Sequence, residues 1–248
     1  MKNSNKNANL KEKLKQALTS TVKVLSDDLS LKNKSKENTD SKNFNSFELD
    51  YLNSKTDFIK ARADSDSIAL KKKFSNEKIY MKNLPANSSC KSLYSIAEKI
   101  RYETLGGRML KGIEKNFKEN YNQIINLKRK DQLKSRDDVS VTEAFELYML
   151  KKFHGIKLNS LTSKMLDFWE KDFDKAFDDH IEYLKENIES QGKYSAKFSE
   201  ILKKMDIFQN DVEEQAREEN QDQGQNNPSN DDQDSNSEDQ KDQNKEEE

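Results

Sequence analysis

The stretch that decides how this fold is interpreted runs from residue 97 to residue 116 and reads Ala97-Glu98-Lys99-Ile100-Arg101-Tyr102-Glu103-Thr104-Leu105-Gly106-Gly107-Arg108-Met109-Leu110-Lys111-Gly112-Ile113-Glu114-Lys115-Asn116. Its apolar residues recur at three- and four-residue spacings, which is the period of an amphipathic helix. Glu98, Arg101 and Glu103 lie on about two turns of that helix. Paired glycines follow without a proline. Packing alone does not require this pattern, so we take the charged residues as the candidate site.

The three charged residues have two interpretations. Glu98 and Arg101 are helix neighbours that can form an ion pair, whereas Glu103 lies roughly on the opposite side of the helix. We expect a buried or half-buried ion-pair network that ties this helix to its neighbours. The alternative is that Arg101, Glu103 or the nearby Arg108 contacts a partner protein. Trp169 is expected in the core, with an interface position as the alternative, because aromatic and Arg residues dominate binding hot spots.

The composition indicates an all-α fold with a modest core. Of the 248 residues, 32% are hydrophobic and 36% are charged, and the chain has only two prolines and six glycines. Few prolines and glycines together with many Lys, Glu and Leu residues favour helices over a turn-rich β architecture. We therefore predict a single multi-helix domain.

Charge is distributed very unevenly along the chain. The net charge is −2, yet residues 211–248 contain fifteen acidic and three basic residues and no aromatic residue. Such a segment cannot bury enough apolar surface to offset the entropy lost on ordering. We predict a helical domain over residues 1–210 and a disordered acidic tail over residues 211–248.

Apolar spacing, caps and breakers divide the helical domain into six helices. Gly155 is expected just after the fourth helix, where a left-handed residue often ends a helix. Gly106, Gly107 and Gly112 should mark a close helix–helix approach or a bend. Leu10, Phe58 and Met109 are among the residues expected to be buried. The expected helices are 8–26, 55–81, 91–120, 140–153, 160–189 and 194–207, with a short strand at 29–31, a polar loop at 32–45 and a charged connection at 128–138.

Signals for metal, nucleotide and catalytic sites are absent from the sequence. His154, His180 and Cys90 are far apart, and no spacing typical of a zinc site occurs. Glu98 and Glu103 would bind a hard cation only with ligands from elsewhere in the fold. The segment 107–112 has the glycine spacing of a phosphate-binding loop, but the Lys and hydroxyl residues that should follow are missing. We expect no catalytic residue, metal site or bound cofactor in this chain.

The chain shows no sign of a nucleic-acid or membrane partner. The basic runs 71–73 and 128–130 are short and lack an aromatic stacking platform. No window contains the eighteen or so apolar residues of a membrane span. The amino terminus is polar, unlike a secretion signal, and a single cysteine fits a reducing compartment. We therefore expect a cytoplasmic protein.

The stretch quoted first resembles the E-x-x-R-x-E-x-x-G signature in the amino-terminal region of the CobT subunit of aerobic, ATP-dependent cobaltochelatase. The resemblance extends over roughly residues 8 to 248, through segments 61–70, 143–155, 166–169 and 191–208 and the acidic segment that follows. Glu170 stands where the family usually has Arg, and Ser75-Asn76 stands where it often has His-Asp. The family continues beyond its acidic linker into a von Willebrand A-type domain, which this sequence lacks.

The resemblance implies a non-catalytic coupling subunit of a cobaltochelatase complex. That complex is a metal–nitrogen ligase that inserts cobalt into a corrin ring, hydrogenobyrinic acid a,c-diamide, in aerobic cobalamin biosynthesis. The implied partners are a ring-forming AAA+ ATPase subunit and a large tetrapyrrole-binding subunit, and the complex as a whole uses cobalt, ATP and magnesium. Three alternatives stay open. The chain could partner an AAA+ ATPase in another remodelling task, be a non-functional truncated fragment, or be an unrelated helical scaffold or nucleic-acid-binding protein.

Overall fold

Every regular element is helical within the described residues, which are 2–30, 54–127 and 135–205 of this computed structural model. The predicted all-α fold is therefore confirmed for this part of the chain. The helices are α1 (Lys2–Leu25), α2 (Lys55–Phe74), α3 (Glu77–Asn83), α4 (Ser88–Met109), α5 (Lys111–Leu127), the 3₁₀ turn η2 (Arg136–Asp138), α6 (Val141–Met149), the π-helical turn η3 (Leu150–His154), α7 (Ser160–Asp167), α8 (Glu170–Glu186) and α9 (Gln191–Lys203).

Some predictions fall outside the described residues. These are the polar loop at 32–45, most of the charged connection at 128–138, and the acidic tail with its boundary at residue 210. They stay predictions. The short strand expected at 29–31 is wrong where it can be checked, because Leu29 and Ser30 lie in a turn after α1. The Ser30 backbone N–H and hydroxyl both donate to the Asp28 carboxylate, which stabilises that turn.

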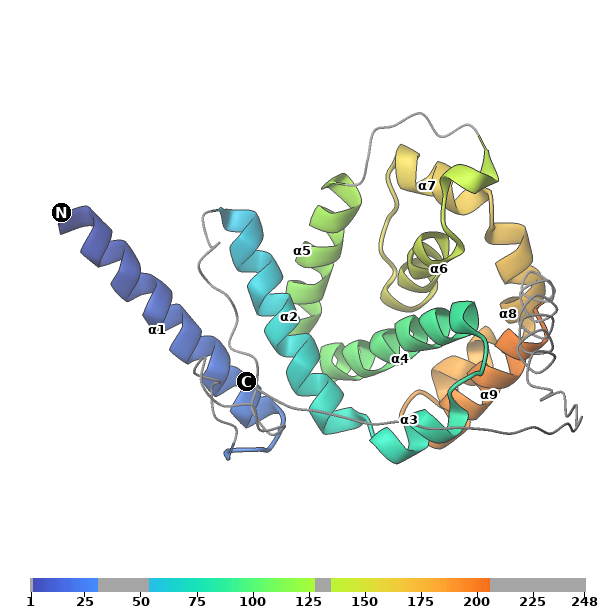
Figure 1. Cartoon of the computed structure of the whole chain (residues 1–248), viewed down its shortest axis with the longest axis horizontal. Helices are drawn as coiled ribbons and strands as arrows, with labels where there is room; N and C mark the ends of the chain where they lie inside the picture. Colours follow the sequence, from blue (N-terminus) through green and yellow to red (C-terminus); the bar gives the residue numbers. More distant parts are fainter. Residues whose placement is uncertain (1, 31–53, 128–134, 206–248) are drawn as a thin grey trace, which may run out of the picture. The chain divides into compact units, whose positions relative to one another are not determined.

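The core forms around α4, which packs against α2, α5, α6 and α9 (Figure 1). The side chains of Leu93, Ala97 and Ile100 on α4 are completely buried. Between α6, α8 and α9 the core is aromatic. Phe145 lies at the centre of this aromatic cluster, with ring centroids 5.4, 5.7 and 6.0 Å from those of Phe173, Phe177 and Phe198. Tilted and edge-on pairs at these separations stabilise the core beyond the area that they bury.

Helix α1 packs mainly on one neighbour, α2 (Figure 1). Leu18 packs with Ala61 of α2, and Val22 packs with Ala69, in two small clusters that are separate from the main core. The predicted apolar stripe thus exists, but it does not extend over the whole helix. Leu10, one of its expected members, is exposed.

The helix predicted over 55–81 is divided in the structure. Ser75 and Asn76 have extended backbones and separate α2 from α3. The Asn76 side-chain oxygen accepts hydrogen bonds from the first free backbone N–H groups of α3, at 2.9 and 3.3 Å. A side chain of this type competes with helix continuation and favours a new start.

The helix predicted over 91–120 is also divided, at Leu110. Its φ of −137° and ψ of 115° are extended, yet its backbone groups are all used. The Leu110 N–H donates to the Gly106 carbonyl at the end of α4, and the Leu110 carbonyl accepts from Ile113 and Glu114 at the start of α5. The two helices therefore meet at one well-defined residue instead of a loop.

The glycines of this region explain how the helices come together. A Cβ on Gly106 would lie only 2.3 Å from Cδ1 of Leu70, so this glycine permits the close approach of α2 and α4. A Cβ on Gly107 would lie 3.4 Å from Cβ of Glu114 on α5. The predicted close approach is therefore confirmed at Gly106, whereas at Gly107 the contact is an ordinary one. At Gly112 a Cβ would meet nothing within 4 Å among the described residues, and the bend predicted as the alternative lies two residues before it, at Leu110.

The prediction for the next helix holds at both ends. Ser140 caps α6 by accepting a hydrogen bond from the Glu143 backbone N–H. The chain leaves the π-helical turn at Gly155, whose φ of 61° is left-handed. Glycine adopts this conformation without the steric penalty that a Cβ brings.

The helix predicted over 160–189 is wrong in its continuity, because it is interrupted at Phe168 and Trp169 between α7 and α8. The Trp169 indole N–H donates to the Val139 carbonyl at 3.0 Å, which fixes the interruption against the start of α6. The last predicted helix starts three residues earlier than expected, at Gln191.

Two further residues expected in the core lie at the surface. Phe58 is 38% exposed and Met109 is 41% exposed. Phe58 stands in the first turn of α2, where the Arg62 guanidinium lies 5.7 Å from its ring centroid. Met109 stands in the last turn of α4, beyond the close approach at Gly106. Helical period predicts which face a residue occupies, but the ends of a helix often extend past the elements that bury that face.

Candidate functional site

Arg101 lies at the centre of a buried polar network on α4. Its side chain is 1% exposed. The guanidinium donates from Nε to Oε2 of Glu98 at 2.9 Å and from Nη2 to Oε1 of the same carboxylate at 2.8 Å. This two-pronged geometry is the strongest that an Arg–carboxylate pair adopts. Two further N–H groups donate to the backbone carbonyls of Phe74 at 2.5 Å and Ile188 at 3.3 Å. Arg101 therefore joins α4 to the end of α2 and to the segment before α9.

The Glu98 carboxylate extends the same network. It accepts hydrogen bonds from the Ser75 hydroxyl at 2.7 Å and from Nε2 of Gln191 at 3.0 Å. Gln191 also accepts from the Asn76 backbone N–H at 2.7 Å and donates to the Asn76 carbonyl at 3.3 Å. The extended break between α2 and α3 is thus hydrogen-bonded to both α4 and α9, through Ser75 to Glu98 and through Asn76 to Gln191. A fully satisfied buried network of this kind specifies one arrangement of its helices.

Glu103 faces a different part of the protein. Its side chain accepts hydrogen bonds from the Ser67 hydroxyl at 2.7 Å and from the Tyr121 hydroxyl at 2.5 Å. Within the described residues no cation lies within ion-pair distance of it. Burial raises the pKa of the Glu103 carboxyl above its ordinary value, and the charge of Lys99 opposes that effect only in part. Burial and the neighbouring carboxyl likewise raise the pKa of Tyr121.

A third buried carboxyl links α2 to α5. Asp66 accepts a hydrogen bond from Nδ2 of Asn116 at 2.7 Å, and both residues are buried. Burial raises the pKa of Asp66 above its ordinary value. Polar groups that are buried in this way stabilise a particular packing only when each one finds a partner.

Arg108 and Trp169 lie away from this network. Arg108 is exposed at the end of α4. Trp169 is half-buried, its ring covered by the Arg136 guanidinium at 3.6 Å from the ring centroid. Arg136 in turn pairs with Asp172 of α8 at 3.0 Å. The structure therefore brings Glu98 and Arg101 together, places Glu103 on the other side of the same helix, and leaves Arg108 and Trp169 separate.

Several hydrogen-bond partners of Glu98 and Glu103 carry no signal that sequence reasoning can use. Ser67, Ser75 and Gln191 are ordinary polar residues, and Gln191 is 93 positions from the carboxylate that it contacts. Only Asn76 has a local signal, as a residue type that favours helix starts. Tyr121 falls one turn after the apolar stripe that extends to Phe117, but nothing in that spacing indicates a carboxylate partner.

The two histidines and the cysteine lie on three different elements, η3, α8 and α4. His154 is half-buried with its ring 5.8 Å from that of Tyr121, and burial lowers its pKa to about 4. His180 lies on α8, and Cys90 is buried at the start of α4. Across the described ranges, no group of three or more His, Cys, Asp or Glu side chains is placed to hold a metal ion.

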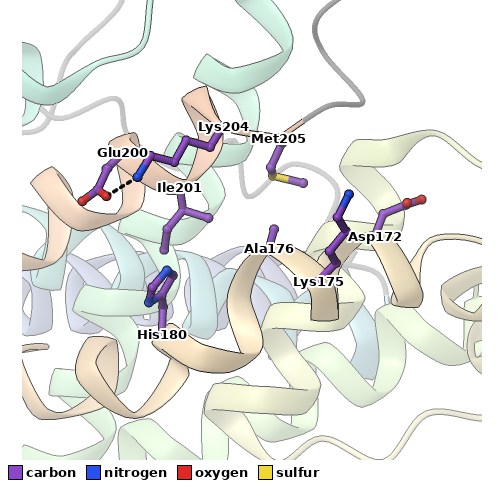
Figure 2. A pocket seen from close by; sticks show the side chains of 8 residues that line it. All are labelled: Asp172, Lys175, Ala176, His180, Glu200, Ile201, Lys204 and Met205. Atoms are coloured by element: carbon purple, nitrogen blue, oxygen red, sulfur yellow. Dashed lines mark hydrogen bonds and ion pairs between the residues drawn. The ribbon is translucent and has the colours of Figure 1, made fainter.

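A pocket of about 210 Å³ lies between α8 and α9 (Figure 2). Ala176 and Ile201 form apolar parts of its wall, and Met205 closes one side. Glu200 at its rim pairs with Lys204 at 2.7 Å and with Lys197 at 3.3 Å. The pocket is lined by Asp172, Lys175, Ala176, His180, Glu200, Ile201, Lys204 and Met205. Its mixed charges show no constellation for catalysis, and the buried network lies elsewhere.

Comparison with known families identifies what the chain is. Residues 8–248 match the family described as cobalamin biosynthesis protein CobT. The chain belongs to the CobT family. The resemblance inferred from the stretch 97–116 is thereby confirmed, and membership of the CobT family connects the chain with cobalamin biosynthesis.

Two further findings accompany the match to the CobT family. No solved structure matches this chain. Among the helices that the structure describes, none combines the length and the apolar character that crossing a membrane requires.

Proposed function

We propose that this chain is a non-catalytic subunit of a cobaltochelatase complex that inserts cobalt into hydrogenobyrinic acid a,c-diamide in aerobic cobalamin biosynthesis. In this proposal it couples a ring-forming AAA+ ATPase subunit to a large tetrapyrrole-binding subunit. The observation that carries the proposal is the match to the CobT family over residues 8–248.

The geometry of the helical domain supports a coupling role. The network of Glu98, Arg101 and Gln191 bonds the α2–α3 break, α4 and α9 to one another. A subunit that transmits force or position between two partners needs helices that keep their relative arrangement. Buried, fully paired polar groups supply this property, because any displacement leaves a charge unpaired.

The division of labour follows from the same proposal. Cobalt is the metal that the complex transfers, and ATP with magnesium is hydrolysed by the AAA+ subunit. The chain itself contributes surfaces and no bound cofactor, and the complex acts in the cytoplasm. Titration calorimetry of the purified chain with cobalt or with ATP should show no tight binding. A micromolar cobalt site that disappears in Glu103→Gln would contradict this part of the proposal.

Reconstitution tests the function directly. The chain, the AAA+ subunit and the large subunit of the same genome are purified separately and mixed with hydrogenobyrinic acid a,c-diamide, cobalt, magnesium and ATP. Formation of the cobalt corrin is followed by its absorption spectrum. We expect product only when all three proteins and ATP are present.

The omission experiments decide between the alternatives. If product forms at the same rate without this chain, the coupling role is wrong. If the chain binds the AAA+ subunit but never supports cobalt insertion, the alternative of another AAA+-dependent remodelling task is favoured. If it binds neither subunit, the proposal of a functional complex fails.

A further inference from the structure

The junction between α4 and α5 exposes an unusual set of side chains. Met109 is 41% exposed and Leu110 is 45% exposed, and Arg108 just before them is also exposed. Among the large exposed apolar residues of the described part of the chain, these two are the only pair adjacent in sequence. Isolated exposed apolar residues are normal on protein surfaces, whereas contiguous apolar patches with a polar rim mark interaction sites.

The junction is held in a fixed shape. The extended Leu110 donates its N–H to Gly106 at 2.9 Å and accepts at its carbonyl from Ile113 at 3.0 Å. Gly106 is itself pressed against Leu70 of α2. A surface whose backbone is already ordered loses little conformational freedom when it binds, so its affinity is not reduced by ordering.

The charge of the junction is positive. Residues 108–119 contain four cations and two acidic residues, Glu114 and Glu119. Lys111 and Lys118 share the Glu114 carboxylate at 3.1 and 2.8 Å, and Lys115 pairs with Glu119 at 3.9 Å. Within the described residues no carboxylate lies within ion-pair distance of Arg108. A partner that carries acidic side chains around an apolar contact would complement this surface.

We propose that Arg108, Met109 and Leu110 form a docking surface for an acidic, partly apolar face of the AAA+ subunit. This inference rests on the proposed function, which supplies the partner, and adds the face of this chain that binds it. Met109 and Leu110 provide the apolar contact, and Arg108 pairs with a carboxylate of the partner. Arg and Met are among the residues enriched in the cores of protein interfaces.

Binding measurements with matched variants test the docking surface. The full chain and the AAA+ subunit of the same genome are purified, and their Kd is measured by biolayer interferometry. We expect Arg108→Glu and the double variant Met109→Ser/Leu110→Ser each to raise the Kd at least about tenfold, as loss of a hot spot does. The control variants Met81→Ser and Lys193→Glu, at exposed positions elsewhere, should bind like the wild type.

The remaining outcomes are equally informative. Since all three residues are exposed, the melting temperatures of the variants should stay within about 2 °C of the wild type. If the wild type binds and both variants bind equally well, the docking surface is wrong while the proposed function stands. If the wild type does not bind the AAA+ subunit at all, the proposed function fails at its partner. If the wild type sediments as a dimer and the variants as monomers, a second copy occupies this surface and the inference is overturned.

Discussion

Glu98 and Glu103 are both buried on α4, yet the protein accommodates them in opposite ways. Glu98 meets a cation, Arg101, in a two-pronged pair whose remaining hydrogen bonds go to segments distant in sequence. Glu103 meets two hydroxyl groups and no cation within the described residues, and burial raises its pKa. Burying a carboxylate demands either a permanent counter-charge or a readiness to take up a proton. The Arg101 side of α4 should therefore be the less tolerant of mutation, and the stability contributed by the Glu103 side should depend on pH.

The largest expected effect is that of Arg101→Ala. Removing the cation leaves the Glu98 carboxylate buried and unpaired, which should lower the free energy of unfolding by about 3–5 kcal/mol. Chemical denaturation followed by circular dichroism measures this loss. Arg101→Lys keeps a positive charge without the two-pronged geometry, so it should fall between the wild type and the Ala variant. A loss below about 1 kcal/mol for Arg101→Ala would mean that the network contributes no more than a surface ion pair.

On the other side of α4, Tyr121→Phe should have a smaller effect. The variant removes the 2.5 Å hydrogen bond to Glu103 and leaves only the Ser67 hydroxyl. Loss of a hydrogen bond to a carboxyl in the interior should lower the free energy of unfolding by about 1–3 kcal/mol. Tyr194→Phe is the matched control, because its equally buried hydroxyl donates to a backbone carbonyl, that of Ala97. Equal losses in the two variants would show that Glu103 is not a special acceptor.

The ion pair at Arg101 could be predicted from the sequence, whereas the hydroxyl pair at Glu103 could not. Residues three apart on a helix are always neighbours, so the contact between Glu98 and Arg101 can be predicted as soon as the helix is predicted. Ser67 is 36 positions from Glu103 and Tyr121 is 18 positions from it. Contacts across such separations depend on how helices fold back on one another, and helical period carries no information about that.

The same distinction separates the helix ends that were predicted from those that were missed. Ser140 and Gly155 mark a start and an end through their own chemistry, a capping side chain and a left-handed glycine. The breaks at Leu110 and Trp169 involve large apolar residues with no intrinsic tendency to end a helix. The break at Trp169 is fixed from outside, by a hydrogen bond to Val139, and the break at Leu110 lies between Gly107 and Gly112, glycines that were expected to mark a close approach or a bend. Tertiary contacts therefore decide what local propensity leaves undetermined.

A third prediction concerns the titration of Glu103. Its pKa in the folded state lies above the ordinary value of 4.5, so the folded chain holds this proton more tightly than the unfolded chain does. The contribution to stability is therefore largest at low pH and is lost as pH rises from about 4.5 through the folded pKa. Glu103→Gln cannot titrate and should remove this fall. At neutral pH it should be at least as stable as the wild type, the opposite of Arg101→Ala.

Denaturation curves at half-unit steps between pH 4 and 8 measure the titration of Glu103. Because other carboxyl groups also titrate, the informative quantity is the difference in unfolding free energy between variant and wild type at each pH. Asp64→Asn is a suitable comparison, since burial also raises the pKa of Asp64, which belongs to a separate, half-buried position on α2. If the difference for Glu103→Gln is constant with pH, the pKa of the Glu103 carboxyl is the same in the folded and unfolded chain, and the contrast between the two sides of α4 is wrong.

The smallest expected effect is that of His154, which has the opposite sign to Glu103 in the same neighbourhood. Its ring lies beside Tyr121, and burial lowers its pKa from 6.5 to about 4. The unfolded chain then binds the proton more tightly, so stability is lost as pH falls from about 6.5 towards 4. His154→Gln should remove that loss. The change should be smaller than for the completely buried Glu103, since the ring of His154 is only half-buried and solvent screens part of its charge. NMR titration of the His154 ring protons measures the pKa directly, and a value near 6.5 would show that the ring is solvated and contributes nothing to the pH dependence.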